Sequence, residues 1–531
     1  MSLKYEGPVV LAVLDGVGLR NELAGNAVKQ AHTEFLNMVV NNYPTLALSA
    51  SGTAVGVLPD DMGNSEVGHN AIGSSQIVKQ GVAQIQEAFD TGAIYESKAW
   101  KEAISHATKK GATLHFAGIL SNGNVHSSIY HLEKMIDKAH SEGVKKIRIH
   151  AVLDGRDTPP QSADQYVSAI EALVNQYPDH PDYRFASGGG RMIFVADRYE
   201  NDWGVVKAGW DAIVHAEAPY QFSSALEAIS TFRAGDPNIQ DQYIPPFVIC
   251  ENGKPVGKVK NGDAFIYFDF RADRAIEIAQ AFTYNDFPYF DRGDRPDVYF
   301  VGMTEYNSDT HVPEHRLVEP IKISNTLSEV LSHKGLKQLA VAETVKFGHI
   351  TYYFNGNSYE KFPGEEQVEI PSDTVPFDTR PWMKSAETAD VVIRDMKNYD
   401  FVRLNFAGGD MVGHFAELEP TITALEAIDI QLARIAREVD ALGGILLVTA
   451  DHGNAEELVD AEGNPKTAHT TNLVPLIFYD NTKNREKYNV IEKLADSGYP
   501  GLSNIAPTVA NLLGIDELPE SWNQSLISAK E

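Results

Sequence analysis

The sequence predicts an α/β protein with mainly parallel sheets, in which one domain is interrupted by a second. Short apolar runs alternate with segments of helical periodicity, which is the pattern of parallel strands covered by helices. The 531 residues are too many for one hydrophobic core. Motifs rich in aspartate and histidine lie towards both ends of the chain, whereas arginine motifs lie in the middle. The two ends are therefore predicted to form one domain, and the middle to form the other.

Seven short apolar runs are predicted to be buried strands. The first, residues 8–14, ends at Asp15, and its lack of polar alternation is typical of a strand covered on both faces. Helical periodicity is clearest at residues 421–442, where leucines and isoleucines form one apolar stripe. The other predicted strands are residues 113–120, 146–153, 265–269, 338–342, 401–407 and 444–449.

We place the domain crossings near residues 79–81 and 318–320, between the two kinds of motif. Neither crossing is a long linker rich in proline and glycine. The first domain is then expected to comprise residues 1–79 and 321–531, and the inserted domain residues 80–320.

The composition excludes several classes of protein. A net charge of −28, from 73 acidic and 45 basic residues, argues against nucleic-acid binding, which needs clustered cations. The single cysteine, Cys250, excludes an intramolecular disulfide and a cysteine-based zinc site, and we treat it as an inert core residue. The first apolar run is too short for a signal sequence or a membrane span. We therefore expect a cytoplasmic protein without nucleic-acid or membrane partners.

Three aspartates stand at or just beyond the ends of predicted strands: Asp15, Asp410 and Asp451. In open α/β sheets, functional sites assemble at the carboxyl ends of the strands. A single aspartate at such a position more often caps a helix or a turn. Three of them, each near a histidine or a glycine, favour a functional site.

Histidines accompany these aspartates at spacings that suit a metal. His414 follows Asp410 by four residues and would share one helical face with it. His452 is adjacent to Asp451, so both could bind one ion only if the chain turns at the following glycine. His469 alone would be interpreted as a loop residue. Together, the mixed oxygen and nitrogen ligands indicate divalent transition metals.

Ser65 lies between glycines and is a candidate nucleophile. A serine hydroxyl needs activation at neutral pH, and a metal can supply it. Alternatively, Ser65 caps a helix that begins at Glu66, and a helix N-terminus also favours phosphate. The segment contains no Gly-x-Ser-x-Gly motif, so a hydrolase triad is not indicated. Two metals and a serine favour phosphoryl transfer.

The middle of the chain carries arginines close to glycines and to predicted strand ends. Arginine binds phosphate and carboxylate groups in a bidentate way, so the set fits a small substrate with both groups. An isolated arginine would more simply form a surface ion pair. Lys346 follows another predicted strand and is a further candidate for phosphate. The motifs of the middle segment are His126, Arg156 with Asp157, Arg191, Arg198, and Arg271 with Arg274.

These motifs, in this order, resemble those of the cofactor-independent phosphoglycerate mutases, a family within the alkaline phosphatase superfamily. The resemblance extends over nearly the whole chain. It implies an alkaline-phosphatase-like α/β/α sandwich interrupted by a second α/β domain that binds the substrate. The motifs are Leu14-Asp15-Gly16, Gly63 to His69, Asp154 to Asp157, Asp410 to His414, Asp451 to Asn454, and Ala468-His469-Thr470.

The resemblance also implies a role for each candidate residue. One metal would be held by Asp410, His414 and His469, and a second by Asp15, Asp451, His452 and Ser65. Mixed ligands of this kind accept Mn²⁺, which we expect, and also Co²⁺, Mg²⁺ or Zn²⁺. Lys346 would stabilise the transferring phosphoryl group. The substrate would be bound by His126, Arg156, Asp157, Arg191, Arg198, Arg271, Arg274 and Lys346.

The expected activity is the interconversion of 3-phosphoglycerate and 2-phosphoglycerate in glycolysis and gluconeogenesis. Ser65 would carry a phosphoserine intermediate, Asp157 would act as general base, and no 2,3-bisphosphoglycerate would be needed. The family resemblance suggests a monomer. A metal-dependent phosphohydrolase or a sugar-phosphate mutase of the same superfamily is the first alternative. A non-catalytic metal-binding protein is the second.

Overall fold

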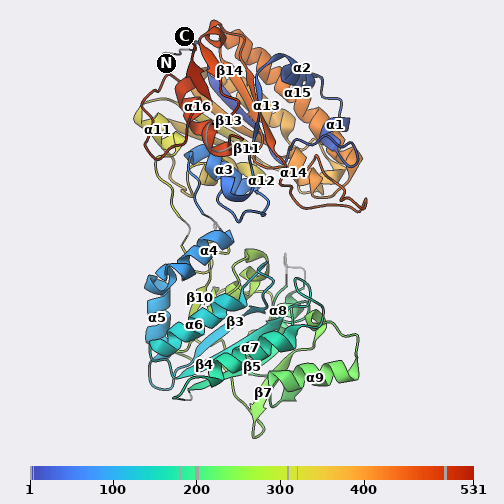
Figure 1. The fold of residues 1–531 in the computed structure, drawn as a ribbon, viewed down its shortest axis with the longest axis vertical. Coiled ribbons are helices and arrows are strands. Elements are labelled where there is room, and N and C mark those ends of the chain that lie inside the picture. The colour runs from blue at the N-terminus through green and yellow to red at the C-terminus, as the bar shows by residue number, and fades with distance from the viewer. Residues whose placement is uncertain are drawn as a thin grey trace. The chain divides into compact units, whose positions relative to one another are not determined.

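The computed structural model divides the chain into two compact units (Figure 1). Unit 1 comprises Met1–Ala83 and Ile321–Glu531, and unit 2 comprises Gln84–Pro320. No helix within the described part of the chain has both the length and the hydropathy to cross a bilayer. The structure describes residues 3, 5–79, 81–179, 181–197, 202–307, 310–319, 321–494 and 499–530.

Unit 1 is built on a seven-stranded sheet in the order β12-β11-β13-β1-β14-β15-β2. The first five strands are parallel, and β15 is antiparallel to both of its neighbours. The four strands predicted in this unit are all present. The strands are β1 (Val9–Leu14), β2 (Thr45–Leu48), β11 (Gln338–Glu343), β12 (Glu365–Ile370), β13 (Phe401–Phe406), β14 (Ile445–Thr449) and β15 (Val474–Tyr479), with a separate hairpin of β16 (Tyr488–Val490) and β17 (Ile527–Ala529).

Helices cover both faces of this sheet, so the predicted α/β/α sandwich is confirmed (Figure 1). The predicted helix at residues 421–442 is α15 (Leu418–Leu442), which begins three residues earlier and ends at Gly443 in the left-handed region, with φ of 72°. The other helices beside α15 are α1 (Ala27–Gln30), α2 (Glu34–Asn42), α13 (Ser385–Asp395) and α14 (Gly408–Gly413), and the opposite layer contains α3 (Ser65–Ser74), α11 (Leu327–His333), α12 (Thr344–Gly348) and α16 (Ile505–Leu512).

Unit 2 has a second, mainly parallel sheet in the order β10-β9-β3-β4-β5-β7-β6, with β8 paired to β7. The strands from β10 to β5 are parallel, whereas β7 is antiparallel to β5 and to β8 and parallel to β6. The strand predicted at residues 265–269 is shorter than expected and ends at Tyr267. The strands are β3 (Leu114–Leu120), β4 (Lys146–Leu153), β5 (Asp182–Gly190), β6 (Tyr220–Phe222), β7 (Phe247–Glu251), β8 (Lys254–Pro255), β9 (Ala264–Tyr267) and β10 (Tyr299–Gly302).

Helices pack on the sheet of unit 2, with α7 against β3 and β5, and α5 against β9 and β10. The order of strands and helices alternates along the chain, as the sequence predicts. The helices are α4 (Gly81–Asp90), α5 (Lys98–Ala107), α6 (Ile129–Ser141), α7 (Ala163–Asn175), α8 (Trp203–Trp210), α9 (Ala225–Gly235) and α10 (Ile276–Thr283).

A buried ion pair links β13 to β12 across β11 in unit 1. Arg403 of β13 and Glu365 of β12 have fully buried side chains that form an ion pair. Arg403 also donates to the Ile350 carbonyl at 2.8 Å and lies 4.4 Å above the Phe354 ring. A buried charge is tolerated when its partner and its hydrogen bonds are supplied. This ion pair therefore stabilises the interior of the sheet. It lies towards the start of β13, away from Ala407, which follows the carboxyl end of that strand.

In both units, polar side chains gather beyond the carboxyl ends of the strands. In unit 1, β1 is followed directly by Asp15, and β14 is followed two residues later by Asp451. In unit 2, β4 is followed by Asp154 and β5 by Arg191. Parallel strands end at one edge, so each sheet presents its candidate residues together.

Asp269 lies just beyond β9 in unit 2 and is fully buried. Its Oδ1 atom accepts a hydrogen bond from the Ile119 amide at 2.7 Å. Burial raises the pKa of the Asp269 carboxyl to about 7, against the lowering effects of that hydrogen bond and of Arg191. Asp269 therefore takes up a proton near neutral pH.

Replacing Asp269 with asparagine should remove a pH dependence from the stability of unit 2. The pKa is about 7 in the folded chain and about 3.9 in an unfolded one, so the native protein loses stability as pH rises between these values. The advantage of Asp269→Asn over the native chain should grow by up to ~4 kcal/mol from pH 4 to pH 7 and then level off. Hydrogen exchange of the β3 amides measures the difference, and a difference that is constant from pH 4 to pH 8 would contradict the assignment.

Candidate functional site

The loop after β1 brings Asp15 against the start of α14. Gly16 has φ of 74°, and a Cβ atom there would lie 2.7 Å from the Asp410 Cα. The position therefore needs glycine, both for its backbone conformation and for the close approach. The Asp15 side chain is fully buried and faces the Asp410 side chain across Lys346.

Lys346 lies at the centre of this group. It belongs to α12, and its Nζ atom is 2.7 Å from Asp15 Oδ1 and 2.6 Å from Asp410 Oδ2. The same atom donates to Ser65 Oγ at 2.8 Å. Burial disfavours the ammonium charge, but Asp15 and Asp410 outweigh it and hold the pKa of Lys346 above its ordinary value. Lys346 is therefore a fixed positive charge beside the serine.

Ser65 is the first residue of α3, and Asn64 is the N-cap. The Asn64 side chain accepts a hydrogen bond from the Val67 amide, so the proposal that Ser65 itself caps the helix is wrong. The Ser65 hydroxyl lies instead 3.2 Å from Asp15 Oδ1 and 3.0 Å from His452 Nε2. It is thus free to take part in chemistry at the helix N-terminus.

The turn after β14 points both Asp451 and His452 into the site. The Nε2 atom of His452 is 3.5 Å from Asp15 Oδ1 and 3.6 Å from Asp451 Oδ2. Asp451 Oδ1 accepts from the Gly16 amide at 3.3 Å. The turn needs glycine at position 453, because the side chains of Glu456 and Thr470 approach it so closely that a Cβ atom there would collide with them.

His414 and His469 complete the cluster at its more exposed side. His414 follows α14 directly and shares a face with Asp410, as the four-residue spacing predicts, with Nε2 3.2 Å from Asp410 Oδ1. His469 Nε2 is 3.1 Å from the same oxygen. Hydrogen bonds to backbone carbonyls at 2.6 and 2.9 Å engage the Nδ1 atoms of His414 and His469. Both Nε2 atoms are thereby directed towards Asp410.

The donor set fits divalent cations. Three buried carboxylates surround one ammonium group, so roughly two negative charges remain without a cationic side chain. Carboxylate oxygens and imidazole nitrogens are ligands that divalent transition metals accept. Two groups of residues could each hold an ion, because the potential ligand atoms inside each group all lie within 4.8 Å of one another. The groups are Asp15, Asp451 and His452, and Asp410, His452 and His469. His452 is common to both groups, whereas the family resemblance gives it to one ion only.

Sequence reasoning missed the side chains that hold these carboxylates. Asn405, in the buried strand β13, donates to Asp15 Oδ2 at 2.7 Å. His69 lies 3.3 Å from Asp451 Oδ2 through Nδ1. Asn454 donates to Asp410 Oδ1 at 3.3 Å. Two of the three lie inside the quoted motifs, and an asparagine in an otherwise apolar strand was the available signal for Asn405.

The candidate substrate residues of unit 2 form a second cluster. Arg191 is almost fully buried, and its Nη1 atom contacts Asp154 Oδ1 at 2.6 Å and also pairs with Asp157. His126 lies 3.9 Å from Asp157 Oδ2 through Nε2 and 3.3 Å from Asp273 Oδ1 through Nδ1. Burial lowers the pKa of His126, in spite of Asp273, so the imidazole is neutral at pH 7.

The remaining predicted arginines differ in their surroundings. Arg156 and Arg271 are exposed. Arg274 is buried and donates to the Ala196 carbonyl at 2.5 Å, so part of its guanidinium supports the backbone. Arg198 lies outside the described residues. The structure therefore brings His126, Asp157 and Arg191 into direct contact distance, and places Arg156 and Arg271 at the surface of the same unit.

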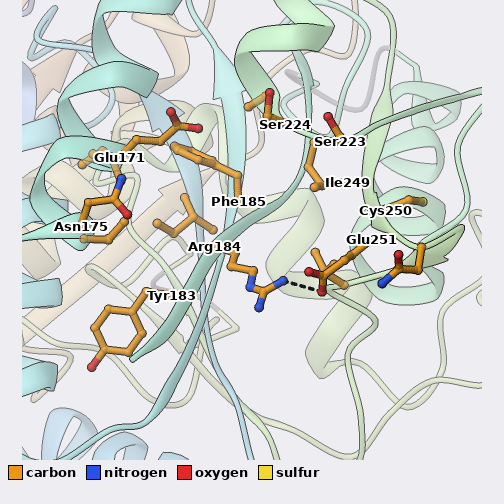
Figure 2. A pocket seen from close by; sticks show the side chains of 16 residues that line it. Glu171, Asn175, Tyr183, Arg184, Phe185, Ser223, Ser224, Ile249, Cys250 and Glu251 are labelled. Carbon is orange, nitrogen blue, oxygen red and sulfur yellow. Dashed lines mark hydrogen bonds and ion pairs between the residues drawn. The ribbon is translucent and has the colours of Figure 1, made fainter. Parts of the chain in front are cut away.

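A cavity of about 560 Å³ lies elsewhere in unit 2, against the first half of β5 (Figure 2). Its walls come from β4, β5, β7, α7 and the start of α9, and Arg184 pairs with Glu251 across it at 2.8 Å. Cys250 lines this cavity and is only partly buried, so the expectation that it lies within the core is wrong. None of the predicted metal-binding or substrate-binding residues lines it.

Comparisons with known proteins show the family to which the chain belongs. Residues 7–517 match the family model of the metalloenzyme superfamily. A probable 2,3-bisphosphoglycerate-independent phosphoglycerate mutase of Leptospira interrogans is 45% identical, over 98% of this chain and 97% of that protein. The 2,3-bisphosphoglycerate-independent phosphoglycerate mutase of Trypanosoma brucei brucei is 41% identical over the same shares.

A solved structure is similar over the full length of both chains. The phosphoglycerate mutase of Leishmania mexicana, crystallised at low cobalt concentration, is 39% identical with a TM-score of 0.73, and 100% of each chain is covered. Sequence identity at this level over whole chains shows both the fold and the family of the protein. The chain belongs to the 2,3-bisphosphoglycerate-independent phosphoglycerate mutases of the metalloenzyme superfamily.

Proposed function

We propose that the chain interconverts 3-phosphoglycerate and 2-phosphoglycerate without 2,3-bisphosphoglycerate, by way of a phosphoserine on Ser65. The observation that carries the proposal is the position of the Ser65 hydroxyl. It lies 2.8 Å from the Lys346 ammonium, 3.2 Å from Asp15 and 3.0 Å from His452, at the first residue of α3. A hydroxyl in such a cluster is suited to attack phosphorus, and the helix N-terminus favours the phosphate charge.

Seven residues of unit 1 would hold two divalent ions: Asp15, Ser65, Asp451 and His452 for one, and Asp410, His414 and His469 for the other. When bound, the ions supply positive charge that lowers the pKa of the serine hydroxyl and neutralises the phosphoryl oxygens. We propose Mn²⁺ in this role, with Co²⁺, Mg²⁺ and Zn²⁺ as alternatives. The low-cobalt crystals of the Leishmania mexicana mutase support a divalent metal of this kind.

In the first half of the reaction, Ser65 Oγ loses its proton and forms a bond to phosphorus, while the bond from phosphorus to the glycerate oxygen breaks and that oxygen takes up a proton to become a hydroxyl. Lys346 Nζ, 2.8 Å from Ser65 Oγ, stabilises the negative charge that develops on the attacking oxygen and on the phosphoryl group. Asn405 keeps Asp15 in place, while His69 donates a hydrogen bond to the Ser65 carbonyl through Nδ1 at 2.8 Å and lies beside Asp451. Because these groups are positioned in advance, little reorganisation accompanies the transfer.

In the second half, the other glycerate hydroxyl takes the phosphoryl group back from Ser65. We assign Asp157 as the general base that accepts the proton of that hydroxyl, and the neutral His126 nearby as the group that binds the phosphoryl or passes protons. Arg191 and the other arginines of the cluster bind the substrate carboxylate and phosphate. Arg191 Nη1 is engaged by Asp154 and Asp157, so we assign to substrate the buried Nε atom, which has no hydrogen-bond partner among the described residues.

We further propose that the protein acts as a monomer in the cytoplasm, on a small-molecule substrate and without nucleic-acid or membrane partners. The excess of 28 negative charges supports the absence of nucleic acid. A single cysteine is compatible with a reducing compartment.

Chelation should abolish isomerase activity, and Mn²⁺ should restore it. Conversion of 3-phosphoglycerate is followed through enolase with no 2,3-bisphosphoglycerate present, before chelation, after it and after Mn²⁺ is returned. We expect a loss of at least ~100-fold with the chelator, because the buried carboxylates then lack their counter-charges. Metal-dependent phosphate release without isomerisation would identify a phosphohydrolase instead, and activity that needs 2,3-bisphosphoglycerate and ignores the chelator would exclude the metal and serine mechanism.

Ser65→Ala should reduce turnover to background, a loss of roughly 10⁵-fold or more, since the nucleophile is gone. The fold should survive, because Asn64 and not Ser65 caps α3. Ser74→Ala is the matched control, since Ser74 is a buried serine at the other end of the same helix. The same enolase-coupled rate measures both variants, and near-normal turnover by Ser65→Ala would exclude the phosphoserine.

Arg191→Lys should raise the KM for 3-phosphoglycerate by ~10- to 100-fold, because lysine retains the charge but loses the bidentate fork. Arg184→Lys is the control, because Arg184 lies on β5, the strand that Arg191 follows, but is half-exposed and paired with Asp182 and Glu251. Steady-state kinetics of both variants test the assignment. An unchanged KM in Arg191→Lys would remove Arg191 from the substrate site.

A further inference from the structure

Glu456 is a fully buried acid close to the metal centre that no predicted role includes. Its carboxylate accepts four hydrogen bonds. Oε2 accepts from the Gly18 and Asn454 amides, each at 2.9 Å. Oε1 accepts from the Thr470 hydroxyl and, at 2.9 Å, from the Asn472 side chain. Two donors on each oxygen satisfy a buried carboxylate without a cationic partner.

The four donors come from three separate segments, and each segment carries candidate metal ligands. Gly18 follows Asp15 by three residues, and Asn454 follows His452 by two. Thr470 is adjacent to His469. One side chain therefore joins the loops that supply both of the proposed ions.

Backbone contacts between the segments close the same unit. The Ala455 amide donates to the Gly16 carbonyl at 2.9 Å, and the Thr470 amide donates to the Gly453 carbonyl at 3.0 Å. These bonds join the loops in pairs, whereas the Glu456 carboxylate accepts hydrogen bonds from all three segments.

The loops pack around this carboxylate without free space. A Cβ atom on Gly18 would collide with the Glu456 carboxyl group, and one on Gly453 would collide with Glu456 Oε1 and with the Thr470 hydroxyl. Neither glycine has a positive φ. The need for glycine at both positions therefore comes from the close approach of these side chains and not from the backbone conformation. A glutamine at position 456 would have the same shape but would turn an NH₂ group towards two of the donors.

We propose that Glu456 is a positioning residue that sets the ligand loops of both metal sites at once. The proposal rests on the metal centre described under Proposed function. Glu456 does not contact the reacting atoms. It fixes the distance between the segments that carry Asp15, His452 and His469, and thereby the affinity for both ions.

The test is the Mn²⁺ affinity of the metal-free full chain, measured by titration calorimetry, in Glu456→Gln. We expect both ions to bind ~10- to 100-fold more weakly than in the native chain, because supporting hydrogen bonds of metal ligands have effects of this size. Glu365→Gln is the matched control. Glu365 is also fully buried in unit 1 and pairs with Arg403, so this variant should lose stability while its Mn²⁺ affinity stays native.

Thr470→Val separates positioning from general destabilisation. It removes one donor to Glu456 from the His469 loop alone, so only one of the two ions should bind more weakly, whereas Glu456→Gln weakens both. If Glu456→Gln does not fold, Thr470→Val still decides the matter, because native affinity for both ions in that variant overturns the proposal.

Two further results would also overturn it. Native Mn²⁺ affinity in Glu456→Gln would show that Glu456 does not position the ligands, and equal weakening in Glu456→Gln and Glu365→Gln would show only a loss of stability. The native chain is titrated first. If it binds no Mn²⁺, the proposed metal centre itself is wrong, and that result is distinct from any difference between variants.

Discussion

Burying three carboxylates at one edge of the unit 1 sheet is the constraint on which the rest of the site depends. Asp15, Asp410 and Asp451 are each at most 3% exposed, in a region where an uncompensated charge is costly. The Lys346 ammonium group neutralises part of this negative charge directly, through its ion pairs with Asp15 and Asp410. The neighbouring amides, asparagines and histidines direct the carboxylate oxygens towards the centre. The same arrangement that is unfavourable for folding would give the site its proposed affinity for cations and, through them, for a phosphoryl group.

Unit 2, which we propose binds the substrate, faces the opposite problem, because it would have to attract an anion within a chain of net charge −28. Its most buried arginine, Arg191, is balanced by Asp154 and Asp157 in the described structure. Long-range attraction from the whole protein would act against substrate binding, so the recognition of phosphate and carboxylate must come from short-range, directional hydrogen bonds. Paired acids hold the guanidinium in a fixed orientation, which favours that kind of recognition.

Sequence patterns located the strands and the residues at their ends, because both are local properties. The apolar run before Asp15 and the spacing of Asp410 and His414 are visible in short windows. Contacts between strands are not visible in short windows of sequence. Asn405 reaches Asp15 because it pairs in register with Val13 on the neighbouring strand, and that register is fixed only by the folded sheet. Glu456 was likewise invisible, since three of its four donors lie in other segments, at Gly18, Thr470 and Asn472.

The two interpretations of Ser65 offered by the sequence are separated by its neighbour. A helix N-terminus needs a side chain to accept from its free amides, and a serine that did so would be held away from the carboxylates. Asn64 accepts from the Val67 amide, which leaves the Ser65 hydroxyl to Lys346, Asp15 and His452. The Asn-Ser pair thus divides capping and chemistry between adjacent residues. The proposed nucleophile can then lie at the positive end of α3, where the dipole favours phosphate, without being needed to cap the helix.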